Sequence, residues 1–421
     1  MDINELLKGT ECECGRKHTC DIKYVYIERD ATKRLSEICA DFRSILLVAD
    51  ENTFGAAGSK TVAALGDKVA KKVLFGKSIL VPNEEAIAAV TDALSGIDLI
   101  VGIGSGVIQD LCKYVSFESK VPYVIVATAP SMDGYASNGA AMITGGMKVT
   151  YPAGLPLAIV GDTEVLAAAP MEMLKAGYGD IIGKFSALND WKLSHLINDE
   201  YFCPDIYNLT YQQIERTLKL ADGLLSRNEE SVKAVMEALV IIGILMSFAG
   251  SSRPASGSEH HLSHFFEITG IVENSEYFPH GIDVAFSTVI TAEVREKILN
   301  GTFPKKIYRA TDTELCKEIN AVYKDVAEGC LALQKKVGNY ANDRSALYLE
   351  KEAEIRAILA EMPSSAEIKK MLALVGLSMN DFYALYGKEK IENAVLYAKD
   401  LKDRYTVLWI NYGFYGGKKN V

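Results

Sequence analysis

The sequence has a deficit of positive charge. Among its 421 residues, 45 Lys and Arg stand against 55 Asp and Glu, which gives a formal net charge of −10. A general nucleic-acid binder needs a basic surface to meet the phosphate backbone. The charge balance therefore argues against that class, and we expect no nucleic-acid partner.

The sequence also lacks a long uncharged apolar run. Its most apolar stretch, residues 234–250, contains Glu237 and is shorter than the roughly 20 residues that cross a bilayer as a helix. We therefore predict a buried helix there and no membrane span. The opening residues, MDINELLKGTECEC, do not combine a basic segment with an apolar one as a secretory signal does. We expect a cytoplasmic protein.

Cysteine is too scattered for a disulfide framework. The eight cysteines spread over the chain, whereas small secreted domains concentrate theirs. The exception is a segment that holds Cys12, Cys14, His18 and Cys20. Four soft ligands within nine residues suit a structural zinc ion, although their spacing is tighter than that of paired zinc knuckles. A reduced, partly exposed loop is the alternative, and the sequence leaves both open.

The first part of the chain alternates strand and helix patterns. Amphipathic segments such as GSKTVAALGDKVAKKV predict helices, and SILVP at 78–82 predicts a short strand. Strands separated by helices predict a parallel sheet over about residues 25–165. Longer apolar runs predict the other strands, near the starts of residues 44–55, 98–106, 122–134 and 155–162.

The pattern changes at Pro170, after which long amphipathic or apolar segments dominate. Such segments predict a helical bundle. We therefore expect an α/β domain over residues 1–168, with a Rossmann-like parallel sheet, followed by an all-α domain over residues 169–421.

Four of the six histidines fall within twenty-one residues of the predicted helical domain: His260, His261, His264 and His280. Imidazole is the commonest protein ligand for a transition metal. On a helix, His260 and His264 would project from one face because they are four residues apart. His280 follows in the turn-like sequence FPHG. The cluster predicts a metal site with an open position, while hydrogen-bonded core histidines or a surface coincidence are the alternatives.

A glycine-rich turn follows one of the predicted strands. VGIGSG places Gly102, Gly104 and Gly106 between a strand and a helix, where free backbone N–H groups can hold a phosphate. A tight turn without a ligand is the alternative. Asp50 ends an earlier strand, where a carboxylate can accept hydrogen bonds from a ribose or can merely cap the next helix.

Two further segments carry polar side chains near predicted strand or helix ends. The loop ATAPSMDGYASNG offers Thr128, Ser131 and Ser137 to a cofactor, and Asp133 to a substrate hydroxyl. Asp180 stands between glycines in GYGDIIG. It is either a residue at the start of a helix, stabilised there by the helix dipole, or the carboxylate that completes the metal site.

Together these segments resemble the dehydroquinate synthase-like superfamily, which includes the iron-containing alcohol and glycerol dehydrogenases. Within it they look most like the bacterial branch of the sn-glycerol-1-phosphate dehydrogenases. The resemblance rests on motifs that occur in the family's order over about residues 100–285: GIGSGVIQD, TAPSMDGYAS, GYGDIIGK, SRPASGSEHHLSH and FPHGIDV.

The resemblance implies specific roles. Asp180, His260 and His280 would be the metal ligands, with Asp133, Asp180 and His264 at the substrate. His261 matches no ligand position. The cofactor pyrophosphate would lie on one loop and the rest of the cofactor on a second, with Asp50 at its ribose. The loop for the pyrophosphate comprises Gly104, Ser105, Gly106, Val107 and Ile108. The second loop comprises Thr128, Ala129, Pro130, Ser131 and Ser137.

The implied activity is the reversible reduction of dihydroxyacetone phosphate to sn-glycerol 1-phosphate. It would use NADH or NADPH and one divalent metal ion, zinc or nickel, and the acidic Asp50 favours NAD. Lys148, Lys184 and Arg253 are candidates for the substrate phosphate, or else surface charges. The resemblance also suggests a homodimer or larger homo-oligomer. A different polyol dehydrogenase of the same fold is the alternative, and 3-dehydroquinate synthase, a lyase, is a more distant one.

Overall fold

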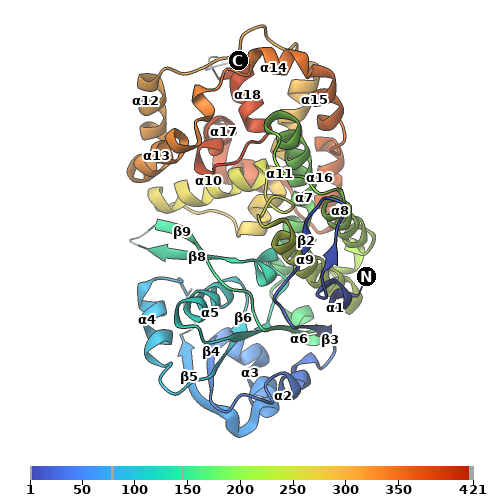
Figure 1. Cartoon of the computed structure of the whole chain (residues 1–421), viewed down its shortest axis with the longest axis vertical. Coiled ribbons are helices and arrows are strands. Elements are labelled where there is room, and N and C mark those ends of the chain that lie inside the picture. The colour runs from blue at the N-terminus through green and yellow to red at the C-terminus, as the bar shows by residue number, and fades with distance from the viewer. Residues whose placement is uncertain (1, 77–79, 145–146, 417–421) are drawn as a thin grey trace. The chain divides into compact units, whose positions relative to one another are not determined.

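The computed structural model describes residues 2–76, 80–144 and 147–416 (Figure 1). The chain forms two compact units. The sheet unit comprises Met1–Ile181 and Asn208–Ser252, and the helical unit comprises Ile182–Tyr207 and Arg253–Val421. The chain crosses twice from one unit to the other inside continuous helices, which are α7 (Met171–Asn198) and α8 (Pro204–Lys219). The expected domain boundary at residues 168 and 169 stays a prediction.

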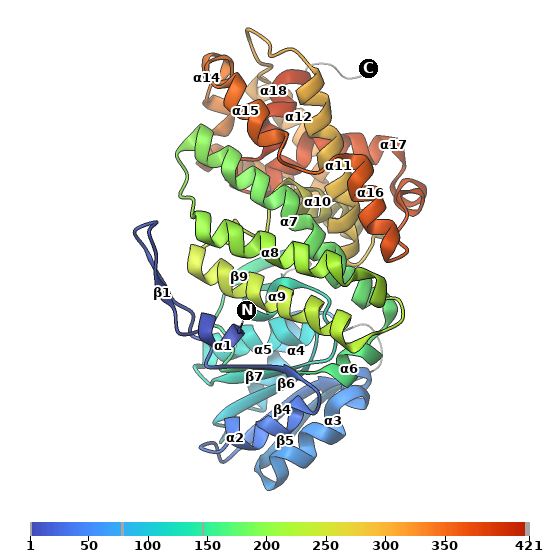
Figure 2. The same cartoon turned by 90° about the vertical axis from the view of Figure 1, so that its right-hand side faces the viewer.

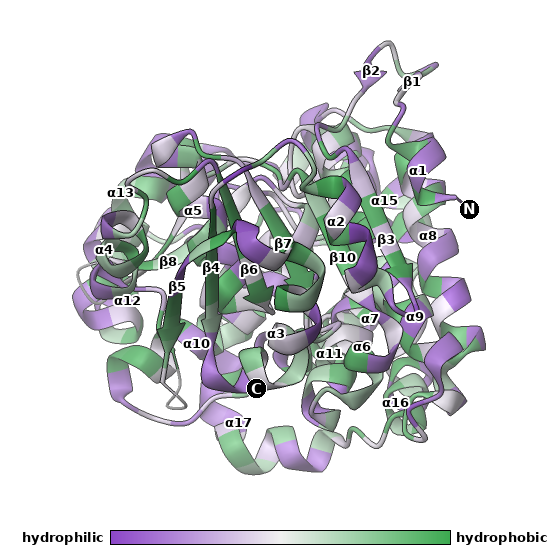
Figure 3. Ribbon diagram, turned by 90° about the horizontal axis from the view of Figure 1, so that it is seen from below, coloured by the Kyte–Doolittle hydropathy of each residue, from purple (hydrophilic) through white to green (hydrophobic). Residues whose placement is uncertain are grey.

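The sheet unit is built on a six-stranded parallel sheet. Its central strands are almost wholly buried, as near-continuous apolar runs predict for a sheet covered on both faces. Figure 3 shows β4 and β6 as hydrophobic ribbon. In spatial order the strands are β3 (Tyr24–Glu28), β10 (Ala158–Asp162), β7 (Tyr123–Ala127), β6 (Leu99–Gly104), β4 (Ile45–Asp50) and β5 (Val69–Phe75).

The segment GSKTVAALGDKVAKKV is not one helix, and this prediction was wrong. Helix α3 (Glu51–Leu65) ends before Gly66, and the chain then forms the edge strand β5. Gly66 takes a φ of 58°, which lies outside the helical range, so the helix ends there. Glycine adopts this conformation more readily than residues that carry a side chain. Exposed lysines on β5 suit an edge strand, since charge there opposes pairing with another chain. The expected strand at 78–82 falls partly outside the described residues.

Other elements of the sheet unit connect these strands or cover them. Helix α5 (Gly106–Ser119) follows β6, and an antiparallel hairpin of β8 (Gly139–Thr144) and β9 (Met147–Pro152) was not predicted. Helix α9 (Glu229–Ala249) is the one helix among the described residues that is long and apolar enough to cross a membrane. Because 83% of its most apolar window is buried inside the protein, the prediction of a buried helix is confirmed.

The helical unit is a bundle in which α11 packs against α10, α16 and α17 (Figure 2). A second layer of its core gathers Leu193, Ile298, Ile355 and Trp409. The fold therefore confirms the expected class, a Rossmann-like sheet with a largely helical C-terminal region. Its helices are α10 (Ser258–Glu273), α11 (His280–Asn300), α12 (Asp312–Tyr323), α13 (Ala327–Val337), α14 (Ser345–Glu350), α15 (Glu352–Leu359), α16 (Ser365–Leu374), α17 (Met379–Tyr397) and α18 (Val407–Tyr415).

Candidate functional site

The glycine-rich turn joins the end of β6 to the start of α5. A Cβ on Gly104 would lie 2.5 Å from Cβ of Ile108, and one on Gly102 would lie 2.8 Å from Sγ of Cys112. These two glycines thus let the helix pack closely on its strand. Gly106 differs, because the nearest atom to its Cβ position is Cε of Met132 at 3.7 Å. The Ser105 side chain makes no capping hydrogen bond, so it does not occupy the first N–H groups of α5.

The second predicted cofactor loop begins beside the first. The strands β6 and β7 pair Gly104 with Ala127, and the N–H of Thr128 donates to the carbonyl oxygen of Gly104 at 3.1 Å. Parallel strands end at a common edge, which is where such sheets bind ligands. Ala129 is buried and its carbonyl accepts a 2.7 Å hydrogen bond from the Tyr135 hydroxyl. Pro130 is also buried, while Ser131 is half-buried.

Lys113 organises this loop, and no sequence motif pointed to it. Its ammonium group is fully buried and donates to the carbonyl oxygens of Gly134 and Gly139, each at 2.9 Å. It also donates to Oγ of Ser137 at 3.2 Å and to Oδ1 of Asp110 at 3.3 Å. Burial lowers the pKa of Lys113 despite the pairing with Asp110. Ser137 is therefore held in place by a buried cation.

Asp50 is the N-cap of α3. Its side chain accepts the N–H of Thr53 at 2.8 Å, and the Thr53 hydroxyl completes a capping box. The capping alternative for Asp50 is thus present in the structure. Contact with a ribose stays a prediction.

Three imidazole rings gather in the helical unit where α10 meets the start of α11. The ring centroids of His260 and His280 are 5.1 Å apart, those of His264 and His280 5.5 Å, and those of His260 and His264 6.3 Å. The expected helix thus carries His260 and His264 on one face. His261 is fully buried elsewhere on α10, and its ring nitrogens have no hydrogen-bond partner among the described residues.

A carboxylate fixes the orientation of His260. Nδ1 of His260 lies 2.7 Å from Oε1 of Glu259, an oxygen that also accepts the Gly257 N–H at 2.9 Å. An imidazole that donates from Nδ1 to a carboxylate presents the lone pair of Nε2, as metal-bound histidines do. Burial, helped by the charge of Lys184, lowers the pKa of His260 well below its ordinary value. The ring is therefore neutral, which is the form that binds metal.

The Nδ1 atoms of His264 and His280 make longer contacts than that of His260. Burial lowers the pKa of His264 to about 3, and its Nδ1 lies 3.7 Å from Oε2 of Glu267. His280 places its Nδ1 3.4 Å from the hydroxyl of Ser263. Neutral His264 can donate or accept a hydrogen bond but carries no charge near pH 7.

Asp180 is not at the start of a helix, so the alternative based on the helix dipole is wrong. It is the tenth residue of α7, fully buried, and its Oδ2 accepts the N–H of Asp133 at 2.9 Å. Three residues later on the same helix face, a Cβ on Gly183 would lie 2.5 Å from Val284 and 3.3 Å from Glu259. Helix α7 therefore packs closely on α10 and α11 one turn after Asp180.

Two overlapping sets of ligand atoms result. Within the helical unit, His264, Glu267 and His280 can each present one ligand atom, and these atoms lie within 4.8 Å of one another. The other set is the predicted one of Asp180, His260 and His280, which alone has the carboxylate-oriented imidazole of His260. That these three residues share one ion stays a prediction.

The cations near these histidines differ from those expected. Lys184 and Arg253 are buried, so the interpretation of either as a surface charge was wrong. The Arg253 guanidinium pairs with both Glu200 oxygens, at 2.6 and 2.5 Å. Sequence reasoning missed Lys402 and Arg404. Burial is the main cause that lowers the pKa values of His264 and His261, and the charges of Lys402 and Arg404, respectively, lower them further. The Lys148 side chain lies outside the described residues.

Comparisons with known proteins agree with this architecture. The family described as iron-containing alcohol dehydrogenase matches residues 26–170. The chain is 30% identical to the glycerol-1-phosphate dehydrogenase (NAD(P)+) of Halalkalibacterium halodurans, over 97% of this chain and 98% of that protein. It is 33% identical to the enzyme of that name from Geobacillus thermodenitrificans, over 68% and 73%.

A solved structure shows the same fold. It is an archaeal halo-thermophilic alcohol dehydrogenase from a Red Sea brine pool, which aligns with a TM-score of 0.58 and 12% identity over 96% of this chain and 99% of that one. At such low identity the likeness concerns the fold alone. The near-complete coverage at 30% identity establishes more: the chain belongs to the NAD(P)-dependent glycerol-1-phosphate dehydrogenases, within the iron-containing alcohol dehydrogenases.

Proposed function

We propose that this protein reversibly reduces dihydroxyacetone phosphate to sn-glycerol 1-phosphate with NAD(P)H, at a divalent metal ion held by Asp180, His260 and His280. The observation that carries the proposal is the buried His260, whose Nδ1 is fixed by Glu259 beside the ring of His280. Family membership supplies the reaction class.

The donor set fits a divalent transition metal. One carboxylate and two neutral imidazoles suit zinc or nickel equally well, and three protein ligands leave a position open for a substrate oxygen. When bound, the ion would polarise the C2 oxygen as a Lewis acid. The protein's own contribution is to lower the pKa of His260 by burial and to keep that ring in one tautomer through Glu259.

Other residues would handle the substrate. His264, neutral and half-buried next to His280, would orient a substrate hydroxyl or relay its proton. Asp133 would accept a substrate hydroxyl, and its backbone is fixed by Asp180. For the phosphate we infer Lys402 and Arg404, since they are the cations whose charge reaches the histidines from the segment before α18.

The cofactor would lie along the carboxyl edge of the sheet. The open space beside Gly106 and the uncapped start of α5 support binding of the pyrophosphate there, with Gly104–Ile108 as its loop. The loop from Thr128 to Ser131, together with Ser137, would contact the remainder. Asp50 would meet the ribose while keeping its capping bond, and its charge favours NAD over NADP. We further infer a homodimer or larger homo-oligomer in the cytoplasm.

A substrate panel tests the proposal. Metal-loaded protein is assayed for oxidation of NADH and NADPH with dihydroxyacetone phosphate, dihydroxyacetone and other ketoses. The reverse reaction is assayed with both enantiomers of glycerol phosphate. We expect activity with dihydroxyacetone phosphate and with sn-glycerol 1-phosphate only. Activity with unphosphorylated polyols alone would instead identify a different alcohol dehydrogenase of this fold.

A further inference from the structure

The N-terminal hairpin carries a group of metal-ligating side chains separate from the histidine cluster of the helical unit. Strands β1 (Thr10–Glu11) and β2 (Lys17–His18) pair antiparallel, and the Gly15 N–H closes the turn on the carbonyl oxygen of Cys12 at 3.0 Å. A hairpin with two residues in each strand is marginal in water. Of the residues from Thr10 to Thr19, His18 alone is buried. Contacts with α9, from Arg16 to Ala249 and from His18 to Phe248, hold this hairpin.

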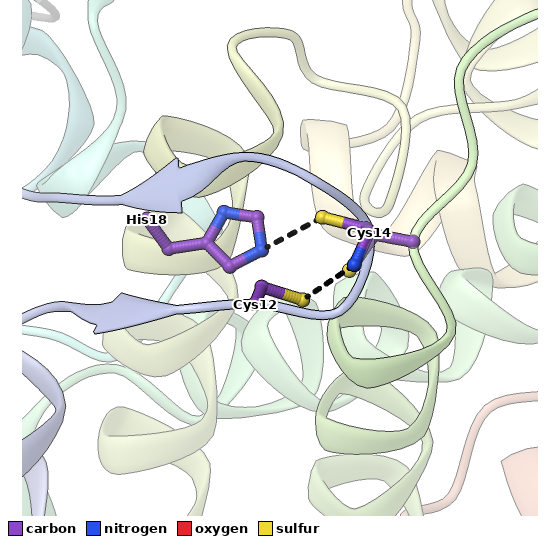
Figure 4. Close-up of side chains that lie close together, drawn as sticks. Cys12, Cys14 and His18 are labelled. Carbon is purple, nitrogen blue, oxygen red and sulfur yellow. Dashed lines mark hydrogen bonds between the residues drawn. The ribbon is translucent and has the colours of Figure 1, made fainter.

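His18 is oriented as a metal ligand would be. Its Nδ1 lies 3.2 Å from the carbonyl oxygen of Phe248, to which it donates, and its ring stacks on the Phe248 ring at 5.3 Å. Donation from Nδ1 leaves the lone pair on Nε2. Figure 4 shows that Nε2 faces the sulfur of Cys14.

The distances match tetrahedral zinc. With Zn–S of about 2.3 Å and Zn–N of about 2.0 Å, a tetrahedral ion holds sulfur and nitrogen about 3.5 Å apart. Sγ of Cys14 and Nε2 of His18 are 3.5 Å apart. Sγ of Cys12 accepts the N–H of Cys14 at 3.5 Å, a bond that stabilises a thiolate (Figure 4).

Cys20 is not part of this group. It follows the hairpin and interacts instead with Ser247 and with the backbone of Ile22. We propose that Cys12, Cys14 and His18, three side chains of one hairpin, bind a structural zinc ion.

The ligand chemistry defines the ion and its role. Two thiolates and one imidazole select zinc over hard cations. The ion would link the two strands of the hairpin. The hairpin is already anchored on α9 by His18, which stacks on Phe248, and by Arg16, which donates to the Ala249 carbonyl oxygen at 3.4 Å. The zinc ion is independent of the metal ion in the proposed reaction.

The test measures zinc in the full-length protein. Protein is purified with zinc, dialysed without strong chelator, and analysed by mass spectrometry for zinc per chain, with X-ray absorption at the zinc edge. We expect Cys14→Ser and Cys12→Ser each to lose one zinc per chain. The matched control Cys20→Ser should keep it. His260→Ala should lose a different ion and retain the sulfur-coordinated one.

The outcomes separate the alternatives. Zinc–sulfur scattering near 2.3 Å that disappears in Cys14→Ser but persists in His260→Ala supports the site. Unchanged zinc content in Cys12→Ser and Cys14→Ser, with no zinc–sulfur scattering in the wild type, overturns it. Circular dichroism of each variant shows whether it is folded, and cobalt(II) uptake with its thiolate charge-transfer absorption gives a second readout.

Discussion

Removing the carboxylate of Glu259 should weaken metal binding although Glu259 is not a ligand. Its Oε1 holds Nδ1 of His260 at 2.7 Å and the Gly257 N–H at 2.9 Å. Loss of such an outer partner costs about 10- to 100-fold in metal affinity. That range corresponds to about 1.4 to 2.7 kcal/mol. Glu259→Gln keeps an oxygen acceptor but loses the charge, so we expect about tenfold, and Glu259→Ala about 100-fold.

The assay is a competition between protein and a chromophoric zinc chelator. It is best made in a Cys14→Ser background, which leaves the histidine site as the one under study. Glu267→Gln is the matched control, because Glu267 lies on the same helix and 3.7 Å from the ring of His264. We expect that variant to keep the affinity within about twofold, well below the effect of an orienting carboxylate.

The two overlapping ligand sets make this comparison decisive. If Glu267→Gln loses more affinity than Glu259→Gln, the ion is bound by His264, Glu267 and His280 instead. If both variants keep full affinity, the orientation of His260 by Glu259 does not matter, and the reasoning is refuted.

Three further perturbations test other parts of the structure. His260→Ala should abolish metal binding at the histidine site. His264→Ala should keep the ion and lower kcat by about 10²- to 10⁴-fold. Equal metal loss in both variants would contradict this division of roles. Lys113→Met removes the ammonium donor from the carbonyl oxygens of Gly134 and Gly139. The variant should raise the KM for NADH and lower the free energy of unfolding by about 1–3 kcal/mol, as calorimetry can measure. Burial alone would raise the pKa of Glu200, but the paired guanidinium of Arg253 holds it below its ordinary 4.5. The stabilisation from this pair is therefore complete above pH 4.5 and is lost as the pH falls through the lower folded pKa. Arg253→Gln should flatten the acid side of the curve of unfolding free energy against pH. An unchanged curve would argue against the pair.

The central strands could be predicted from the sequence because their burial is nearly complete. Runs such as ILLVAD and LIVGIG have no polar face to obscure the pattern. Strand β5 could not, since an edge strand with lysines at 71 and 72 matches a helical pattern as well as it matches a strand. The β8–β9 hairpin was also missed, although β8 alternates buried residues, Ala140 and Met142, with half-buried ones.

The site was only partly accessible to sequence reasoning. Spacing predicted that His260 and His264 share a helix face, and the ring distances confirm it. Lys113, Lys402 and Arg404 lie in no motif, because their positions near the loops and rings depend on packing between segments distant in the sequence.

The roles proposed for His260 and His264 rest on what holds the Nδ1 atom of each ring. Burial lowers the pKa of both rings far below its ordinary value, so charge does not distinguish them. Their Nδ1 atoms differ, since one lies 2.7 Å from a carboxylate oxygen and the other 3.7 Å. The shorter contact fixes a tautomer, and the longer one leaves the ring able to exchange donor and acceptor as a proton relay must. The difference in these two distances is therefore the physical basis for assigning one histidine to the metal and the other to the substrate.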